Sequence, residues 1–195
     1  MARDLERERD EMIKLETMPW RRPMINPLPP RPAPRDTSGE ISPPELDEYL
    51  ALYPQENRRI LSARYHNGSL TASLRHFPYP FTQHDLDYVT ATQLTLYLSQ
   101  LTYVLIGAAL RAQDHPGIPA RFTDHFFSMM HAGRLFFVDL RQKMRRPIWK
   151  SDSITATLDL TETRRTSTTF FVFIAFDINN RSCAGTLTVA TKAPA

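Results

Sequence analysis

The sequence predicts an α+β domain in which a curved antiparallel sheet wraps around one long apolar helix. Three observations support this fold class. Residues 59–77 alternate apolar and polar side chains on either side of Asn67-Gly68, a dipeptide typical of a tight β-hairpin. Residues 90–112 are apolar around the whole helical circumference, which is typical of a buried helix. Residues 134–191 contain only strand-like segments, and this segregation of helix and strands is typical of α+β proteins.

Length and composition fit one domain with an extension. The chain has 195 residues, of which 42% are hydrophobic, and a formal net charge of +3. This small positive charge suits an acidic partner, such as an acyl carrier protein or a phosphorylated cofactor, without requiring one. Cys183 is the only cysteine, so an intramolecular disulfide and a CxxC metal site are excluded, and a reducing cytoplasm is expected. The charged amino terminus lacks the apolar segment of a secretory signal.

Residues 1–41 differ in composition from the rest and are expected to form a charged, proline-rich arm before a single domain of residues 42–195. Proline fixes φ and removes a backbone donor, so this arm is expected to be extended. Pro27-Leu28-Pro29-Pro30 matches a PxxP ligand. An arm that packs on its own or a partner subunit is the favoured alternative, because PxxP alone is a weak pattern.

The domain is expected to begin with a short helix. Ser42-Pro43-Pro44-Glu45 contains a capping serine, a proline suited to the first helical position and the glutamate of a capping box. This helix is expected to run to about Leu52. The hairpin of residues 59–77 follows, and Pro78 ends its second strand. Since strand side chains alternate, one face of that strand carries Leu70, Ala72, Leu74 and His76.

The long helix is expected to start at Thr90 and to reach about Ala112. Polar residues interrupt its apolar stretch, so it is interpreted as a core helix and not as a membrane span. Residues 115–127 contain Pro116 and Pro119 and are expected to form a loop. Strands are expected at 134–144, 154–160, 168–178 and 184–191, with a turn at Asn179-Asn180.

Several of these segments resemble a known family. The stretch from Val89 to Tyr103, with its Ser99-Gln100-Leu101-Thr102-Tyr103 sequence, resembles the central helix of the FcoT-type acyl thioesterases. Ala63-Arg64-Tyr65 and the basic stretch 141–147 are also similar to that family, and the resemblance covers about residues 53–190. It implies a hot-dog fold, in which an antiparallel sheet wraps around a long central helix. Such helices are usually covered by a second subunit, so a homodimer or a dimer of dimers is expected.

The resemblance implies one of two activities. Some members of the family are fatty acyl-CoA thioesterases. Others, in β-amino fatty acid and isonitrile lipopeptide biosynthesis, add glycine to an α,β-unsaturated acyl-carrier-protein thioester, and some of these then hydrolyse the thioester. Thr90 and Ser99 stand where the plain thioesterases carry asparagines, which weakens a direct transfer of thioesterase roles.

Thioester chemistry needs donors that stabilise negative charge on the carbonyl oxygen. The first N–H groups of a helix are unpaired and lie at the positive end of its dipole, so residues 88–93 are the expected oxyanion site. Glycine addition also needs a base, and histidine has a suitable pKa of ~6.5. His76 is the candidate because it continues the inward row of its strand; a hydrogen-bonded core histidine is the alternative.

The resemblance places Tyr53 and Tyr65 among the polar pocket tyrosines, as catalytic candidates beside His76. The remaining candidates are expected to bind substrate: Tyr79, Tyr88, Thr90, Gln93, Tyr97, Ser99, Gln100 and Tyr103. Tyrosines also fill cores with the hydroxyl at an edge. Gln93, Tyr97 and Gln100 lie on one stripe of the helix, which could line a pocket or bond a neighbouring strand.

A basic cluster, with Lys143, Arg145 and Arg146 at its centre, is the candidate receptor for the phosphopantetheine phosphate or an acidic carrier protein. A solvated sheet edge is the alternative. Glycine's carboxylate would suit an arginine fork, but Arg64 and Arg75 fall on the expected outer face of the hairpin, so this role is unassigned.

The sequence contains no GxSxG, P-loop, GxGxxG or HExxH motif, so acid–base catalysis without a metal or cofactor is expected. The first hypothesis is an enzyme that adds glycine to an enoyl-carrier-protein thioester and then hydrolyses the product to an N-carboxymethyl-3-amino acid. A fatty acyl-CoA thioesterase and a non-catalytic acyl-binding module are the alternatives. The expected partners are an acyl carrier protein or acyl-CoA and glycine, without nucleic acid.

Overall fold

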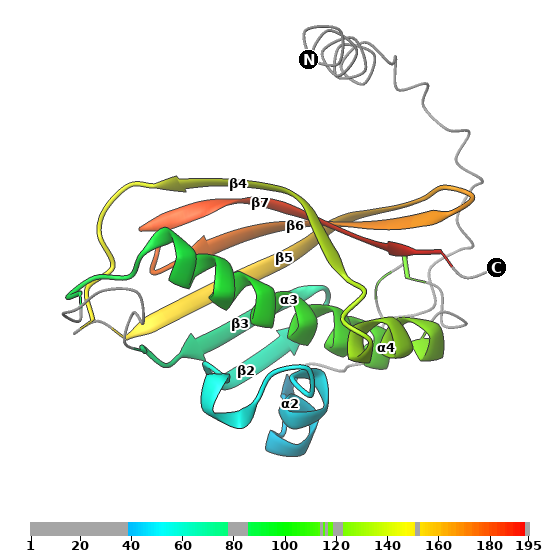
Figure 1. Cartoon of the computed structure of the whole chain (residues 1–195), viewed down its shortest axis with the longest axis horizontal. Helices are drawn as coiled ribbons and strands as arrows, with labels where there is room; N and C mark the ends of the chain where they lie inside the picture. Colours follow the sequence, from blue (N-terminus) through cyan, green and yellow to red (C-terminus); the bar gives the residue numbers. More distant parts are fainter. Residues whose placement is uncertain are drawn as a thin grey trace, which may run out of the picture.

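The structure is a computed structural model and describes residues 39–77, 86–113, 115, 117–118, 123–150 and 153–193. Within these residues, a seven-stranded sheet has the order β1-β2-β3-β5-β6-β7-β4, and all neighbouring strands are antiparallel (Figure 1). The strands are β1 (Gly39–Glu40), β2 (Ile60–His66), β3 (Ser69–Leu74), β4 (Phe136–Met144), β5 (Ile154–Arg165), β6 (Thr169–Ile178) and β7 (Cys183–Lys192).

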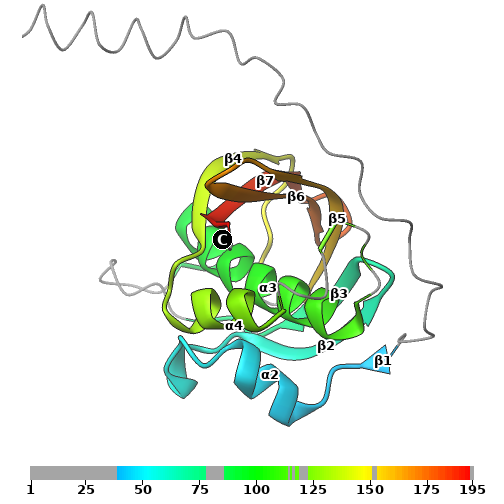
Figure 2. The same ribbon diagram turned by 90° about the vertical axis from the view of Figure 1, so that its right-hand side faces the viewer.

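Helix α3 (Ala91–Ala112) lies along the concave side of this sheet, which curves around it from β4 to β2 (Figure 2). The predicted hot-dog fold is therefore confirmed. By length and composition α3 could cross a membrane, but 83% of its apolar window is buried within the protein. It is thus the core helix that the sequence predicted.

Alternating side chains explain how the sheet covers the helix. Every second residue of β6 is buried, from Phe170 to Ile178, and the residues between them are partly exposed. Leu70, Ala72 and Leu74 of β3 are buried in the same way. Strand side chains point to opposite faces in turn, so each strand presents one apolar row to α3.

The β2–β3 hairpin turns at the predicted dipeptide. Asn67 and Gly68 both have positive φ values, 46° and 83°, as the two-residue turn of a hairpin requires. Strand β3 ends at Leu74, before the predicted Phe77, although the amide of Arg75 still donates to the carbonyl of Arg59 at 2.6 Å. β1 pairs with β2 at the other edge, so Gly39 and Glu40, which fall within the segment assigned to the arm, join the sheet.

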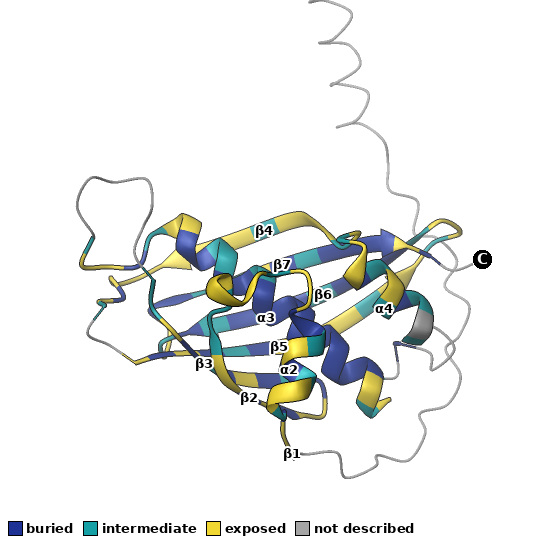
Figure 3. Ribbon diagram, turned by 60° about the horizontal axis from the view of Figure 1, so that its bottom comes forward, coloured by how far each residue is buried: buried dark blue, intermediate teal, exposed yellow. Residues whose placement is uncertain are grey.

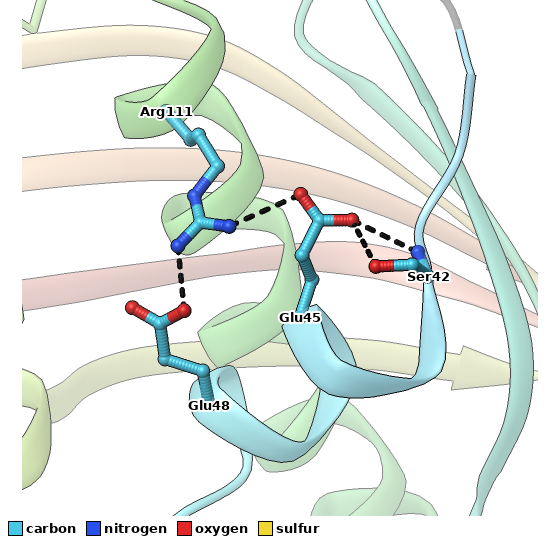
Figure 4. Close-up of polar contacts among 4 residues, drawn as sticks. All are labelled: Ser42, Glu45, Glu48 and Arg111. Atoms are coloured by element: carbon cyan, nitrogen blue, oxygen red, sulfur yellow. Dashed lines mark hydrogen bonds and ion pairs between the residues drawn. The ribbon is translucent and has the colours of Figure 1, made fainter.

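Helix α2 (Pro43–Tyr49) begins as predicted, with Ser42 and Glu45 forming a capping box, but it ends before the expected Leu52. The 3₁₀ turn η1 (Gln55–Asn57) follows. Arg111, in the last turn of α3, pairs with Glu45 at 3.1 Å and with Glu48 at 2.5 Å (Figure 4). These ion pairs attach α2 to the carboxyl end of α3.

The loop predicted for residues 115–127 was wrong, because helix α4 (Thr123–His131) occupies its second half. Pro116 and Pro119 precede this helix and do not interrupt it. Phe126 and Met130, one helical turn apart, are each only 1% exposed, and the Phe126 ring meets Phe170 of β6 edge to face at 5.9 Å. Burial of this short apolar stripe accounts for the helix. The loop prediction rested on the two prolines and did not take this stripe into account.

Strand β4 forms the second edge of the sheet and pairs only with β7 among the described strands. Eight of its nine residues are exposed, as the yellow ribbon in Figure 3 shows. Its large apolar residues share this exposure, with Phe136 at 58% and Val138 at 55%. Long exposed apolar edges favour pairing with another chain.

Candidate functional site

The amino end of α3 is closed by a capping box. The hydroxyl of Thr90 accepts the amide of Gln93 at 3.2 Å, and the Gln93 side-chain oxygen accepts the amide of Thr90 at 2.8 Å. Ala91, at the first helical position, is exposed, and its amide makes no hydrogen bond within the described part of the chain. This amide therefore remains a donor at the positive end of the helix that no hydrogen bond in the described part of the chain uses.

His76 lies beside this end of α3. It follows β3, is partly buried, and its ring lies 6.4 Å from that of Phe77. The Phe77 carbonyl accepts the Gln93 side-chain amide at 2.9 Å. The residue next to His76 in the chain is thus hydrogen-bonded to the first turn of α3. Tyr79, a predicted substrate-binding residue, lies outside the described residues.

The polar stripe of α3 bonds to backbone groups that flank β2 and β3. Gln100 donates to the carbonyl of Asn57 at 2.7 Å and accepts the amide of Arg59 at 2.8 Å. Tyr97 donates to the carbonyl of Arg75 at 3.2 Å, and burial raises its pKa to about 12, partly opposed by the Arg59 charge. Together with Gln93, these side chains bond neighbouring segments, which was the structural alternative to a pocket lining.

A different stripe of α3 reaches the surface. Leu96 and Ser99 are partly exposed, whereas the rest of the helix from Gln100 to Leu110 is buried. The Ser99 hydroxyl forms a very short hydrogen bond with the hydroxyl of Tyr53. Ser99 lies eight residues beyond Ala91, a distance of about 12 Å along the axis. This stripe therefore connects the open end of α3 with a pair of hydroxyl groups.

Tyr103 packs against Tyr53, one member of this hydroxyl pair. Its ring meets that of Tyr53 edge to face at 5.8 Å and is 5% exposed. Burial raises the pKa of Tyr103 to about 12, with a smaller contribution from Tyr53. Burial also raises the pKa of Tyr53, although its bond to Ser99 acts in the opposite direction. Both phenols therefore remain protonated at neutral pH.

Tyr65 does not join this group. Its hydroxyl accepts the amide of Gly68 at 2.9 Å, which closes the β2–β3 turn, and the side chain is 3% exposed. The turn and the chain near Phe77 lie at opposite ends of β3, about 20 Å apart at 3.3 Å per residue. Tyr53, Tyr65 and His76 therefore do not meet as one catalytic group in this chain.

The predicted basic residues divide into two groups. Lys143 and Arg145 are exposed along and just after β4. Arg146 instead turns toward the β6–β7 turn, where it donates to the hydroxyl of Ser182 at 2.8 Å and to the carbonyl of Asn180 at 3.1 Å. Arg64 and Arg75 are exposed, as the outer-face prediction required.

Arg146 lines a surface cleft of about 450 Å³. The other residues that line it are Pro147, Trp149, Ser153, Thr155, Asn179, Asn180 and Ser182. Tyr88 forms an antiparallel bridge with Trp149, and the amide of Val89 donates to the carbonyl of Ile148 at 2.8 Å. Tyr88 is thus a backbone link between the cleft and the start of α3, with 43% of its surface exposed.

The sequence interpretation did not single out Trp149. It is 49% exposed and stands between basic residues, Arg146 and Lys150. The basic neighbours of this tryptophan are visible in the sequence, but its position beside the β6–β7 turn is seen only in the structure.

No family model and no curated protein matches the sequence. Solved structures resemble parts of the chain at low identity. A thioesterase superfamily protein from Shewanella loihica PV-4 is 15% identical over 67% of this chain and 88% of its own, with a TM-score of 0.40. The PaaI protein from the phenylacetic acid degradation operon of E. coli is 12% identical over 69% of this chain and 78% of its own, with a TM-score of 0.38.

A homologue of HP0420 from Helicobacter felis is 16% identical over 77% of this chain and 91% of its own, with a TM-score of 0.42. The hot-dog fold is nevertheless assigned from this chain's own sheet order and buried helix.

Proposed function

We propose that the protein is an enzyme that acts on acyl thioesters at the amino end of α3. The observation that carries this proposal is the amide of Ala91, an exposed residue at the first position of the mostly buried helix α3, which makes no hydrogen bond within the described part of the chain. The partly exposed stripe through Leu96 and Ser99 leads away from it and can contact the acyl group.

The Ala91 amide has the chemistry of an oxyanion donor. When water attacks a thioester, or when an amine adds to an α,β-unsaturated thioester, negative charge develops on the carbonyl oxygen. An N–H group at the positive end of a helix stabilises that charge without reorganisation. A single site at this position can therefore serve both reactions.

The finer proposal is glycine addition followed by hydrolysis. His76 takes a proton from the glycine ammonium group, and the amine nitrogen bonds to the β-carbon. The π pair of the double bond forms the new bond between the α-carbon and the carbonyl carbon, and the carbonyl π pair moves to oxygen. The protonated His76 then gives its proton to the α-carbon of this enolate. Water attacks the thioester, the C–S bond breaks, and the thiol leaves with a proton to give an N-carboxymethyl-3-amino acid. The chemistry uses no metal or cofactor beyond the phosphopantetheine arm of the substrate.

Two features support this order of events. His76 is followed in the chain by Phe77, whose carbonyl is bonded to Gln93 in the first turn of α3, and this supports a base near the path of an amine toward the β-carbon. The Tyr53 and Ser99 hydroxyls offer neutral donors along the stripe that leads from it, and these can orient a carboxylate or a water molecule. The resemblance of residues 89–103 to enzymes with both activities points in the same direction.

Incubation of an enoyl thioester with and without glycine, followed by mass spectrometry, tests the proposal. The expected product with glycine carries the mass of one added glycine and appears as a free acid. If the same hydrolysis product forms with and without glycine, the protein is instead a plain acyl thioesterase. The absence of turnover for any acyl thioester would leave a non-catalytic acyl-binding module and remove the proposed function.

A further inference from the structure

The cleft at the β6–β7 turn has the chemistry of an anion site with an aromatic wall. None of the described residues that line it is acidic, and five of them offer hydroxyl or amide groups: Ser153, Thr155, Asn179, Asn180 and Ser182. Trp149 and Pro147 form its apolar part. A volume of about 450 Å³ falls within the range of small-molecule sites.

Arg146 brings a positive charge to this cleft. Its guanidinium is held by neutral oxygens of Ser182, Asn179 and Asn180, at 2.8, 3.3 and 3.1 Å. No carboxylate pairs with it within the described part of the chain, and its Nη1 group makes no hydrogen bond there. A guanidinium fixed in this way is ready to donate to a phosphate.

The turn beneath Arg146 has an unusual backbone. Asn179, Asn180 and Arg181 are consecutive left-handed residues, with φ values of 49°, 49° and 67°. Arg146 donates to two carbonyls of this turn, and the side-chain oxygen of Asn179 accepts the amide of Thr155 at 2.7 Å. These hydrogen bonds therefore hold the walls of the cleft in place without a ligand.

The cleft lies at the same end of the molecule as the start of α3. Residues 87–89 run antiparallel to 148–150, with hydrogen bonds of 2.8 Å from Val89 to Ile148 and from Lys150 to Asp87. Ala91 is the third residue after Tyr88 in the chain, about 10 Å away when fully extended. A ligand seated against Trp149 can therefore extend toward the Ala91 amide.

We propose that this cleft binds the phosphorylated adenosine of coenzyme A, with the adenine ring stacked on Trp149 and a phosphate bonded to Arg146. The substrate of the enzyme is then a free coenzyme A thioester and not a thioester held by a carrier protein. This inference rests on the proposed function for its biological meaning, but the nucleotide site itself can be tested without turnover.

Calorimetric titration of the full chain with coenzyme A, ADP and pantetheine tests the site. Coenzyme A and ADP should bind, and Trp149→Ala should weaken both by roughly tenfold, because base stacking on an aromatic side chain has about that effect. Trp149→Phe keeps an aromatic face and should retain most of the affinity. Pantetheine, which lacks the nucleotide, should be insensitive to both substitutions.

Arg146 and a matched control complete the design. Arg146→Gln should weaken ADP binding by roughly tenfold and leave adenosine binding unchanged, since only ADP carries phosphate. Arg164→Gln is the control, because Arg164 pairs with Glu162 near the other end of β5 and should not affect either ligand. Melting temperatures establish that each variant is folded.

The possible outcomes distinguish failure of the nucleotide site from failure of the proposed function. Binding of ADP that depends on Trp149, in a protein that turns over no acyl thioester, supports the nucleotide site and removes the proposed function. Turnover of acyl-CoA with the same KM in wild type and Trp149→Ala keeps the function and overturns the nucleotide site. Turnover of carrier-protein thioesters without any binding of coenzyme A also overturns it.

Discussion

The ring of Tyr49 in α2 lies directly against Gly107 in α3. A Cβ atom at position 107 would lie 2.5 Å from the Cδ1 atom of Tyr49, a separation that packed atoms do not adopt. Tyr49 is 2% exposed, and the guanidinium of Arg111 lies 5.5 Å from the centre of its ring. This close approach lets α2 cover the carboxyl half of α3 within a single chain.

Gly107→Ala should therefore lower stability, although alanine favours helices more than glycine does. Overpacking of this kind costs about 1–3 kcal/mol, which should exceed the ~1 kcal/mol gained in helix propensity. Thermal unfolding measures the difference. Gly39→Ala is the control, since a Cβ there meets nothing within 4 Å. Equal melting temperatures for both variants would contradict the packing described here.

The Ser42–Glu45–Arg111 network predicts a pH effect. The hydrogen bond from the Ser42 side chain, more than the Arg111 charge, holds the pKa of Glu45 below its usual 4.5. A lowered folded-state pKa adds stability above the unfolded value, and that stability disappears as the pH falls through the folded value. Because Glu45 is partly exposed, we expect less than about 1 kcal/mol. Unfolding of Glu45→Gln should depend less steeply on pH below about 4.5 than unfolding of the wild type; parallel curves would contradict this.

Gln100 should be important for stability and not for chemistry. Gln100→Leu leaves the amide of Arg59 and the carbonyl of Asn57 without their partner, at a cost of about 2 kcal/mol or more. Denaturant unfolding tests this, with the exposed Gln55→Leu as control. A variant that unfolds like the wild type but has lost activity would contradict this structural role and favour substrate binding by Gln100.

Tyr53 and Tyr65 should give opposite results. Tyr53→Phe and Ser99→Ala each remove one partner of the same hydroxyl pair, so each should lower kcat/KM by roughly tenfold, and the double variant should lose little more. Tyr65→Phe should lower stability and keep the activity, because its hydroxyl bonds the turn amide of Gly68. The loss in Tyr53→Phe should not change around neutral pH, since burial raises the pKa of Tyr53.

The exposed edge β4 predicts self-association. Phe136 and Val138 are more than half exposed on a strand that pairs only with β7 in the described part of the chain, and such an edge favours pairing with a second copy of the chain. Solution mass should correspond to a dimer or a larger even assembly. Val138→Lys should reduce it, whereas Leu61→Lys, at a 53% exposed position of β2, should not. A wild-type monomer at high concentration would refute this prediction.

Periodicity predicted most of the fold because the core-facing strands each bury one face and the long helix is apolar on all sides. The Asn67-Gly68 hairpin, the all-round apolar helix and the alternating β6 strand each carry a strong local signal. Helix α4 was missed because its buried stripe is short, with Phe126 and Met130 at its centre, and two prolines precede it. Local pattern alone does not reveal which neighbour will cover such a stripe.

The site was less predictable for the same reason. The spacing of Gln93, Tyr97 and Gln100 shows that they share a face, but only the fold shows that this face meets backbone groups near β2 and β3. Tyr65 and Tyr53 are alike in sequence terms, yet the first closes a turn and the second reaches Ser99. Trp149 acquires meaning only beside the β6–β7 turn.

Replacement of Ala91 by proline is the most direct test of the oxyanion role. Proline is well tolerated at the first helical position, and the extended backbone of Thr90 suits a following proline, so Ala91→Pro should remove only the N–H group. With an acyl thioester as substrate, thiol release should fall by about 10²–10³-fold in kcat while the melting temperature stays unchanged. Thiol release at the wild-type rate in the folded variant would contradict the role proposed for the amino end of α3.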